Sequence, residues 1–251
     1  ARPGAPVLEV RGLRMVDADG VERLRGIDLS IRAGEIVGIA GVAGNGQTQL
    51  LEILGGYPEP GAKLAGEITL KGQPLALKGS DARARRRAGI GHVPEDRQVE
   101  GLIMDFTAWE NVAFGYHDAP EFQNGLMMDN AAIRADAVGK IERFDVRPPN
   151  PDLASKNFSG GNQQKIVVAR GVDIGAIEVI HKRIVALRDA GKAVLLVSVE
   201  LDEIMALSDR IAVMFDGSIM GERLPDQTTA GDLGCLMAGI APLGQDAEAE
   251  A

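Results

Sequence analysis

Short apolar runs broken by glycine-rich turns open the chain, and this pattern predicts β-strands. The segment Glu35–Ala40 is almost continuously apolar, as expected of a strand that is buried on both faces. A glycine-rich stretch, Gly41–Gly46, follows it, and then a helix-like stretch, Gln47–Leu54, that ends at a glycine pair. A phosphate-binding loop requires this order of strand, loop and helix. Further strands are expected within 7–10, 27–31, 66–76 and 89–93.

The middle of the chain, from about Pro94 to Ala169, has a helical pattern instead. After a capping residue at Asp129 or Asn130, apolar side chains recur at helical spacing as far as Phe144. Strands and helices alternate again towards the C-terminus, with helices expected at 177–190 and 201–207 and strands at 194–197 and 211–215. The chain is therefore predicted to be one domain, 1–251, with an α/β core (7–93 and 171–240) and an inserted helical subdomain (94–170).

Both ends of the chain differ in composition from this core. Residues 1–6 resemble a linker, and the acidic, alanine-rich residues 241–251 are expected to be disordered. The formal net charge of −9 argues against a nucleic-acid partner. No apolar run approaches the ~20 residues that span a membrane, so we expect any membrane role to come through a partner. The lone Cys235 is expected to be a small buried residue.

The glycine-rich loop lacks one residue that a phosphate-binding loop requires. Gly41 and Gly46 have the expected spacing, with Gly44 and Asn45 between them, and Thr48 provides a hydroxyl for Mg²⁺. The backbone N–H groups and the helix N-terminus would attract a phosphate. However, Gln47 replaces the lysine and carries no charge, so we expect weak nucleotide binding and very slow turnover. By itself, the loop is equally compatible with a simple turn between a strand and a helix.

A second motif, Phe158–Lys165, leads directly into a helix. It resembles the signature motif of ATP-binding-cassette (ABC) proteins, in the form typical of importers of simple sugars and nucleosides. The resemblance implies that Ser159, Gly160, Gly161, Asn162 and Gln163 complete an ATP site on an opposing domain. It also implies a P-loop NTPase core, with a mixed or parallel sheet and flanking helices, and an N-terminal antiparallel β portion.

The resemblance covers nearly the whole chain. Residues 89–101 resemble the loop that faces the permease, with Glu95 where most members have glutamine. Residues 171–176 resemble the loop that crosses the dimer interface and include Asp173. The cofactors implied are ATP and Mg²⁺. The implied partners are a catalytic cassette, which we expect in the N-terminal half of the same polypeptide, transmembrane permease subunits and a periplasmic or lipoprotein substrate-binding protein. The chain would then lie peripherally on the cytoplasmic face of the membrane.

Three departures from the family indicate a degenerate site. Besides Gln47, the position of the switch histidine holds Val199, and no aromatic residue precedes Tyr57 to stack on adenine. These losses resemble the C-terminal half of tandem cassette ATPases, and the form of the loop favours the nucleoside branch. An isolated domain of this kind would be nearly inactive. Two alternatives stay open, a soluble cassette ATPase that acts without a permease and a nucleotide-sensing module.

A further expectation concerns the chain between Arg170 and Gly171. In the family, a strand with a magnesium-coordinating aspartate lies between the signature helix and the interface loop, whereas here the two are adjacent. We expect about 15 disordered residues to be hidden by continuous numbering, enough for a return strand at ~3.3 Å per residue and its loops. The alternative is a genuine deletion, which would leave a misfolded or rearranged core. The sheet would then lack the strand beside the phosphate loop. The arginines at 83, 85, 86 and 87 are expected on a solvated helix face, and the three histidines have no metal-ligand spacing.

Overall fold

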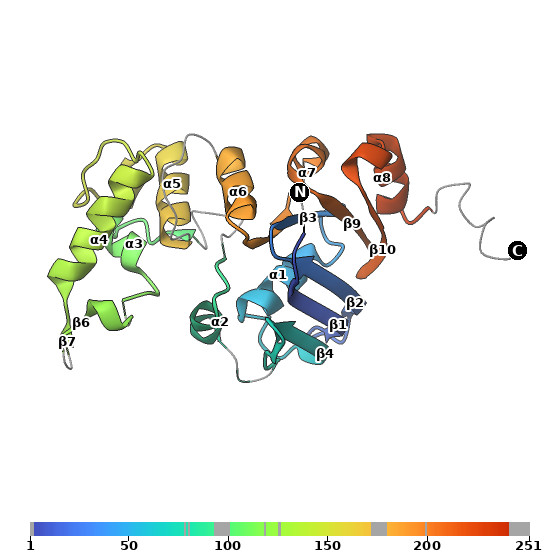
Figure 1. Ribbon diagram of the computed structural model, residues 1–251. Coiled ribbons are helices and arrows are strands. Elements are labelled where there is room, and N and C mark those ends of the chain that lie inside the picture. The colour runs from blue at the N-terminus through green and yellow to red at the C-terminus, as the bar shows by residue number, and fades with distance from the viewer. Residues whose placement is uncertain are drawn as a thin grey trace, which may run out of the picture. The chain divides into compact units, whose positions relative to one another are not determined.

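The computed structural model describes residues 3–77, 79, 81–92, 101–117, 119–124, 127–171, 180–198 and 200–240. These residues form two compact units, one made of 1–88 with 184–251 and the other of 89–183. Figure 1 shows the two four-stranded sheets in the first unit, whereas the second unit consists mainly of helices. Glu95, Asp173, Val199 and the tail 241–251 lie outside the described residues.

The first unit begins with an antiparallel sheet, as the sequence predicted. Its strand order is β2-β1-β4-β5. Alternate side chains of β1 are buried, among them Leu8, Val10 and Met15, because successive residues of a strand point to opposite faces. The turn at Lys71–Gly72 joins β4 to β5. The strands are β1 (Pro6–Val16), β2 (Glu22–Arg32), β4 (Lys63–Leu70) and β5 (Gln73–Pro74).

The second sheet of this unit carries the glycine-rich loop. Its strand order is β10-β9-β3-β8, and β3 (Glu35–Ala40) runs parallel to both β8 (Ala193–Val197) and β9 (Arg210–Phe215). All six residues of β3 are buried, which explains the continuous apolar run. The hairpin strand β10 (Ser218–Arg223) is antiparallel to β9. The combination of parallel core, antiparallel portion and helices is the predicted α/β architecture.

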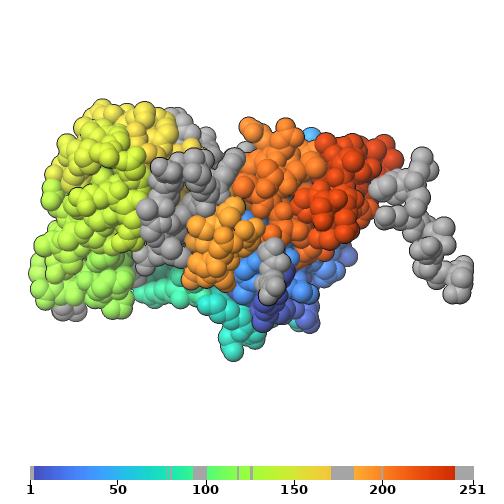
Figure 2. All heavy atoms as spheres, turned by 45° about the horizontal axis from the view of Figure 1, so that its top comes forward, coloured from blue at the N-terminus to red at the C-terminus, as the bar shows by residue number. Residues whose placement is uncertain are grey.

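Helices pack on the second sheet, and their apolar residues share one core with it. Ile204 of α7 (Leu201–Leu207), Leu233 and Leu236 of α8 (Ala230–Met237), and Ile211 of β9 belong to this cluster. The space-filling view shows α7 and α8 as one continuous surface (Figure 2). The other helices assigned to this unit are α1 (Gln47–Gly55), α2 (Ala82–Ala88) and the short η4 (Pro225–Gln227).

The second unit is mainly helical. The Asp129 side chain accepts hydrogen bonds from the amides of Ala131 and Ala132 and so caps α4, which confirms one of the two expected caps. The core of the unit contains Phe144, Ile141, Phe158 and other apolar residues. Its elements are α3 (Ala108–Ala113), η2 (Pro120–Phe122), β6 (Gln123–Asn124), β7 (Met127–Met128), α4 (Asn130–Arg143), η3 (Ser155–Asn157) and α5 (Gly160–Gly171); α6 (Ile180–Asp189) spans the boundary between the units.

Several expectations about single residues were wrong. Cys235 is exposed, because α8 turns Leu233 and Leu236 inward and Cys235 lies on another face. Arg85 is buried rather than solvated, and it donates to the carbonyl oxygen of Ala76 at 2.9 Å. Residues 89–92 form no strand, and Gly89 has a left-handed φ of 100°, which interrupts an extended run.

The expectation for Arg170 and Gly171 also needs correction. Both belong to the continuous helix α5, so the expected gap between them is not observed. The strand beside the phosphate loop is not lacking either, since β3 is flanked by β8 and β9. Among the described strands, β8 pairs with β3 alone and forms the edge of the sheet, and its five residues are only partly buried.

Candidate functional site

The phosphate loop joins β3 to α1 and depends on its glycines. Gly46 has a φ of 101°, and a Cβ added there would lie 2.9 Å from the carbonyl oxygen of Arg23 and 2.8 Å from Leu24. A Cβ at Gly41 would lie 2.8 Å from the carbonyl oxygen of Met214. Contacts this short leave no room for a side chain at either glycine. The spacing seen in the sequence thus reflects close packing of the loop against β2 and β9.

The outer part of the same loop is open. Val42 is 56% exposed, Ala43 and Gly44 are also exposed, and a Cβ at Gly44 would meet no atom within 4 Å. Gly44 has a φ of 91°, which directs the backbone as a turn around an anion requires. Thr48 is exposed in the first turn of α1. These backbone amides and the hydroxyl fit a phosphate group and its cation.

Gln47, at the position of the missing lysine, turns back into the loop. Its side chain is buried, and its Nε2 donates a hydrogen bond of 3.1 Å to the carbonyl oxygen of Val42. The same Nε2 would lie 2.2 Å from a Cβ at Gly41. The amide therefore occupies the inside of the loop and brings no positive charge to it.

The signature residues surround the N-terminus of α5 in the second unit. Ser159 is exposed, and its hydroxyl accepts a 2.9 Å hydrogen bond from Nδ2 of Asn162. Oδ1 of Asn162 accepts a hydrogen bond of 2.8 Å from the backbone N–H of Arg147. Gln163 is buried and donates to the carbonyl oxygen of Ser155 at 3.1 Å. Ser159 and Gly161 can therefore face a ligand, whereas Asn162 and Gln163 order the helix start.

The sequence did not identify one partner of the phosphate loop. The backbone N–H of Asp216 donates to Oδ1 of Asn45 at 3.1 Å, and the N–H of Gly217 donates to the carbonyl oxygen of Asn45 at 3.1 Å. The Asp-Gly pair after β9 was visible as a turn signal. That it touches a loop 171 residues earlier could not be deduced from local pattern.

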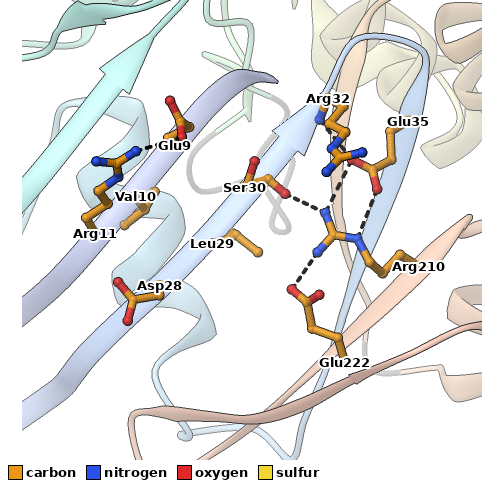
Figure 3. A pocket seen from close by; sticks show the side chains of 10 residues that line it. All are labelled: Glu9, Val10, Arg11, Asp28, Leu29, Ser30, Arg32, Glu35, Arg210 and Glu222. Carbon is orange, nitrogen blue, oxygen red and sulfur yellow. Dashed lines mark hydrogen bonds and ion pairs between the residues drawn. The ribbon is translucent and has the colours of Figure 1, made fainter. Parts of the chain in front are cut away.

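A separate cavity of about 680 Å³ lies at the other end of β3 and includes none of the predicted site residues. Arg210 crosses it and forms ion pairs with Glu35 and Glu222, and it also donates to the carbonyl oxygen of Ser30 (Figure 3). Although burial opposes the charge, the hydrogen bonds to both carboxylates raise the pKa of Arg210. With its charge balanced by two carboxylates, Arg210 joins β9 to the neighbouring strands and has no need of a ligand.

Neither a metal cluster nor a membrane span is found in the part of the chain that the structure describes. No three His, Cys, Asp or Glu side chains there are grouped as metal ligands. No helix within the described ranges has the length and apolar character needed to cross a bilayer.

Comparisons with known proteins agree with both motifs. Residues 24–175 match the family model described as ABC transporter. The guanosine import ATP-binding protein NupO of Bacillus subtilis is 42% identical and the nucleoside import ATP-binding protein NupA of Lactococcus lactis is 40% identical, each over 95% of this chain. The chain spans about half of each relative, 49% in both cases. The ADP conformation of the MJ1267 ATP-binding cassette has the same fold, with a TM-score of 0.70 at 17% identity over 94% of this chain and 96% of that chain.

The same alignments reveal a difference in length inside the matched region. The alignment to NupO has 256 positions, whereas 95% of the 251 residues is about 238, so about 18 positions of NupO have no counterpart here. The NupA alignment has 257 positions over the same share of the chain and leaves about 19. The chain is therefore shorter than these relatives within the cassette itself.

Proposed function

We propose that this chain, which belongs to the ABC transporter family, is one nucleotide-binding cassette of an importer of nucleosides or simple sugars. The observation that carries the proposal is the identity of 42% and 40% to two proteins whose names specify guanosine or nucleoside import, over 95% of the chain. Relatives named for glucose and ribose import are 38% and 34% identical. The nucleoside class is therefore favoured over the sugars.

The cassette would act together with a second one. Because the chain matches about half of each relative, the other half of the same polypeptide is the natural candidate for a catalytic partner. Exposed Ser159 and Gly161 at the N-terminus of α5 would contact the γ-phosphate held by that partner. Permease subunits would provide the membrane passage, a substrate-binding protein outside the membrane would deliver the solute, and the cassettes would lie on the cytoplasmic face.

The chain's own phosphate loop would be a weak, regulatory site. The amides of Val42–Gly44 and the start of α1 would hold the phosphates of ATP, and Thr48 would hold Mg²⁺. Bound ATP would supply the phosphoanhydride bond that water cleaves to give ADP and phosphate, and closure of the cassette pair around ATP would drive the permease. Gln47 would keep its amide within the loop and leave the phosphates without the ammonium group that a lysine supplies, so that hydrolysis at this loop would be slow.

The positions of NupO that have no counterpart in this chain can be assigned to one part of the cassette. We place the roughly 18 absent positions between α5 and β8. Two observations support this placement: α5 and α6 are joined by only residues 172–179, and the apolar strand β8 ends the sheet among the described residues. An apolar parallel strand is ordinarily covered on both sides. Inserting the corresponding NupO stretch after Gly171 would then raise the unfolding midpoint, whereas the same insertion in the exposed Asp19–Gly20 turn would not.

Uptake by cells that produce the complete protein with its permease tests the proposal. Ser159→Arg would place bulk and charge at the signature, and we expect it to abolish uptake of labelled guanosine and ATPase activity, whereas Gln47→Ala would be milder. Asn157→Arg, at an exposed position just before the motif, is the matched control. Equal losses from Ser159→Arg and Gln47→Ala would refute the asymmetry. ATPase activity that is independent of any permease would favour a soluble ATPase.

A further inference from the structure

The turn between β9 and β10 forms hydrogen bonds to the second half of the phosphate loop. Asn45 accepts two hydrogen bonds from it, one at Oδ1 from the Asp216 amide and one at its carbonyl oxygen from the Gly217 amide, both of 3.1 Å. Next to Asn45, the buried Gly46 packs against Leu24 and Met214. Asn45 and Gly46 are thus held from both sides, in contrast to the open residues 42–44.

The turn also contacts β2 through a backbone hydrogen bond and an ion pair. The backbone N–H of Arg25 donates to the carbonyl oxygen of Gly217 at 2.8 Å, and the guanidinium of Arg25 forms an ion pair with the carboxylate of Asp216. Asp216 and Gly217 have φ values of 46° and 74°, as in a tight hairpin turn with two left-handed residues. A Cβ at Gly217 would lie 2.5 Å from the carbonyl oxygen of Arg23, so that the turn cannot approach β2 with any other residue there.

We propose that Asn45 is a positioning residue that, through the Asp216–Gly217 turn, fixes the backbone of the phosphate loop for its ligand. This role rests on the proposed function, because it presupposes that the loop binds the phosphates of a nucleotide. With Gln47 uncharged, attraction of a phosphate depends on the direction of the loop amides and on the start of α1. Amides that are already aligned bind without a further ordering cost. The turn compensates in this way for part of what the lysine would contribute.

Two measurements on the full chain test Asn45 directly. Asn45→Ala removes the acceptor for the Asp216 amide, so we expect hydrogen exchange of the turn amides to accelerate in the nucleotide-free chain. We also expect the affinity for ATP and for pyrophosphate, measured by calorimetry, to fall by about fivefold, as for loss of one hydrogen bond. Because Asn45 is only partly buried, the unfolding midpoint should change little.

A pair of glycine variants separates positioning from general stability. The Lys71–Gly72 turn has φ values of 50° and 75°, nearly those of Asp216–Gly217, but a Cβ at Gly72 would meet no atom within 4 Å. Gly72→Ala and Gly217→Ala therefore impose a similar φ strain, and Gly217→Ala adds a clash with the carbonyl oxygen of Arg23, so both should lower the unfolding midpoint and Gly217→Ala should lower it more. Only Gly217→Ala should lower nucleotide affinity, because only that turn touches the loop.

The outcomes are distinct. Unchanged affinity in Asn45→Ala, with binding by the wild-type chain, would overturn the positioning role alone, as would unchanged exchange of the turn amides. Equal affinity losses in Gly72→Ala and Gly217→Ala would also overturn it. If the wild-type chain bound neither ATP nor pyrophosphate, the proposed function of this loop would fall and the positioning role with it.

Discussion

The Nε2 of Gln47 lies 3.1 Å from the carbonyl oxygen of Val42, to which it donates a hydrogen bond. Gln47, which follows the loop, therefore contacts Val42, the second residue of the loop, and its side chain fills the space beside Gly41. A neutral amide in this place stabilises the loop without a ligand, whereas a lysine there would leave a charge to be neutralised. The loop's shape is therefore kept while its charge is lost.

Replacing Gln47 by lysine should strengthen nucleotide binding. A unit charge at ~4 Å from a phosphate oxygen contributes about 4 kcal/mol at an effective dielectric constant of 20, and desolvation offsets part of this. We expect the Kd for ATP to fall at least tenfold in Gln47→Lys, as measured by calorimetry at fixed salt. Gln49→Lys, two residues further along α1, adds the same charge and is the control. A similar gain in both variants would indicate non-specific attraction only.

The isolated chain should hydrolyse ATP barely above background. Its loop lacks the lysine, and about 18 positions present in NupO have no counterpart within the cassette. Steady-state release of phosphate with magnesium ATP measures this, and turnover of about 1 s⁻¹ or more, near ordinary enzyme rates, would contradict it. Gln47→Lys should improve binding but leave turnover low, because the charge does not replace the absent residues.

The second unit should depend on one buried amide. Asn111 is fully buried, accepts from the N–H of Ile103 at 2.9 Å and donates to the hydroxyl of Ser155 at 2.8 Å. Asn111→Ala would leave these groups unpaired, and we expect the free energy of unfolding to fall by about 2–4 kcal/mol. Denaturant unfolding measures the change. Asn124→Ala, at an exposed position, should cost little, and an equally small effect of both would contradict the role of Asn111.

Asp17 should make stability depend on pH on the acid side. The backbone N–H of Val21 and the guanidinium of Arg23 donate to its carboxylate at 2.8 and 2.7 Å, and these bonds lower the pKa of Asp17. A pKa lowered by folding stabilises the native state above the unfolded-state value of about 3.9, and this contribution is lost as the pH falls through the folded-state pKa.

The variant Asp17→Asn isolates this contribution. Its stability deficit relative to wild type should be largest near neutral pH, should begin to shrink below the unfolded-state pKa of about 3.9, and should vanish only below the lowered folded-state pKa of Asp17. Urea unfolding at several pH values measures the difference. Asp19→Asn changes an exposed carboxylate of the same turn and serves as control. A deficit that does not vary with pH would show that the carboxylate's charge plays no part.

The sequence alone determined most of the elements and both motifs, because these depend on neighbours along the chain. The apolar run of β3, the alternation in β1 and the helical spacing in α4 identified their elements directly. The spacing of Gly41 and Gly46 and the residues that follow Phe158 indicate the family by themselves. Local pattern carries this information because side-chain periodicity is set by the backbone of each element.

Only the tertiary structure decided which distant groups meet. Asn45 and Asp216 are 171 residues apart, and their hydrogen bond exists because β3 and β9 are adjacent parallel strands whose following loops come together at one edge of the sheet. The burial of Arg85 and the exposure of Cys235 also depend on packing against other elements, which composition does not reveal. The direction of the Gln47 amide depends on the fold of its loop. Contacts of this kind arise from three-dimensional packing, so residue type and spacing leave them open.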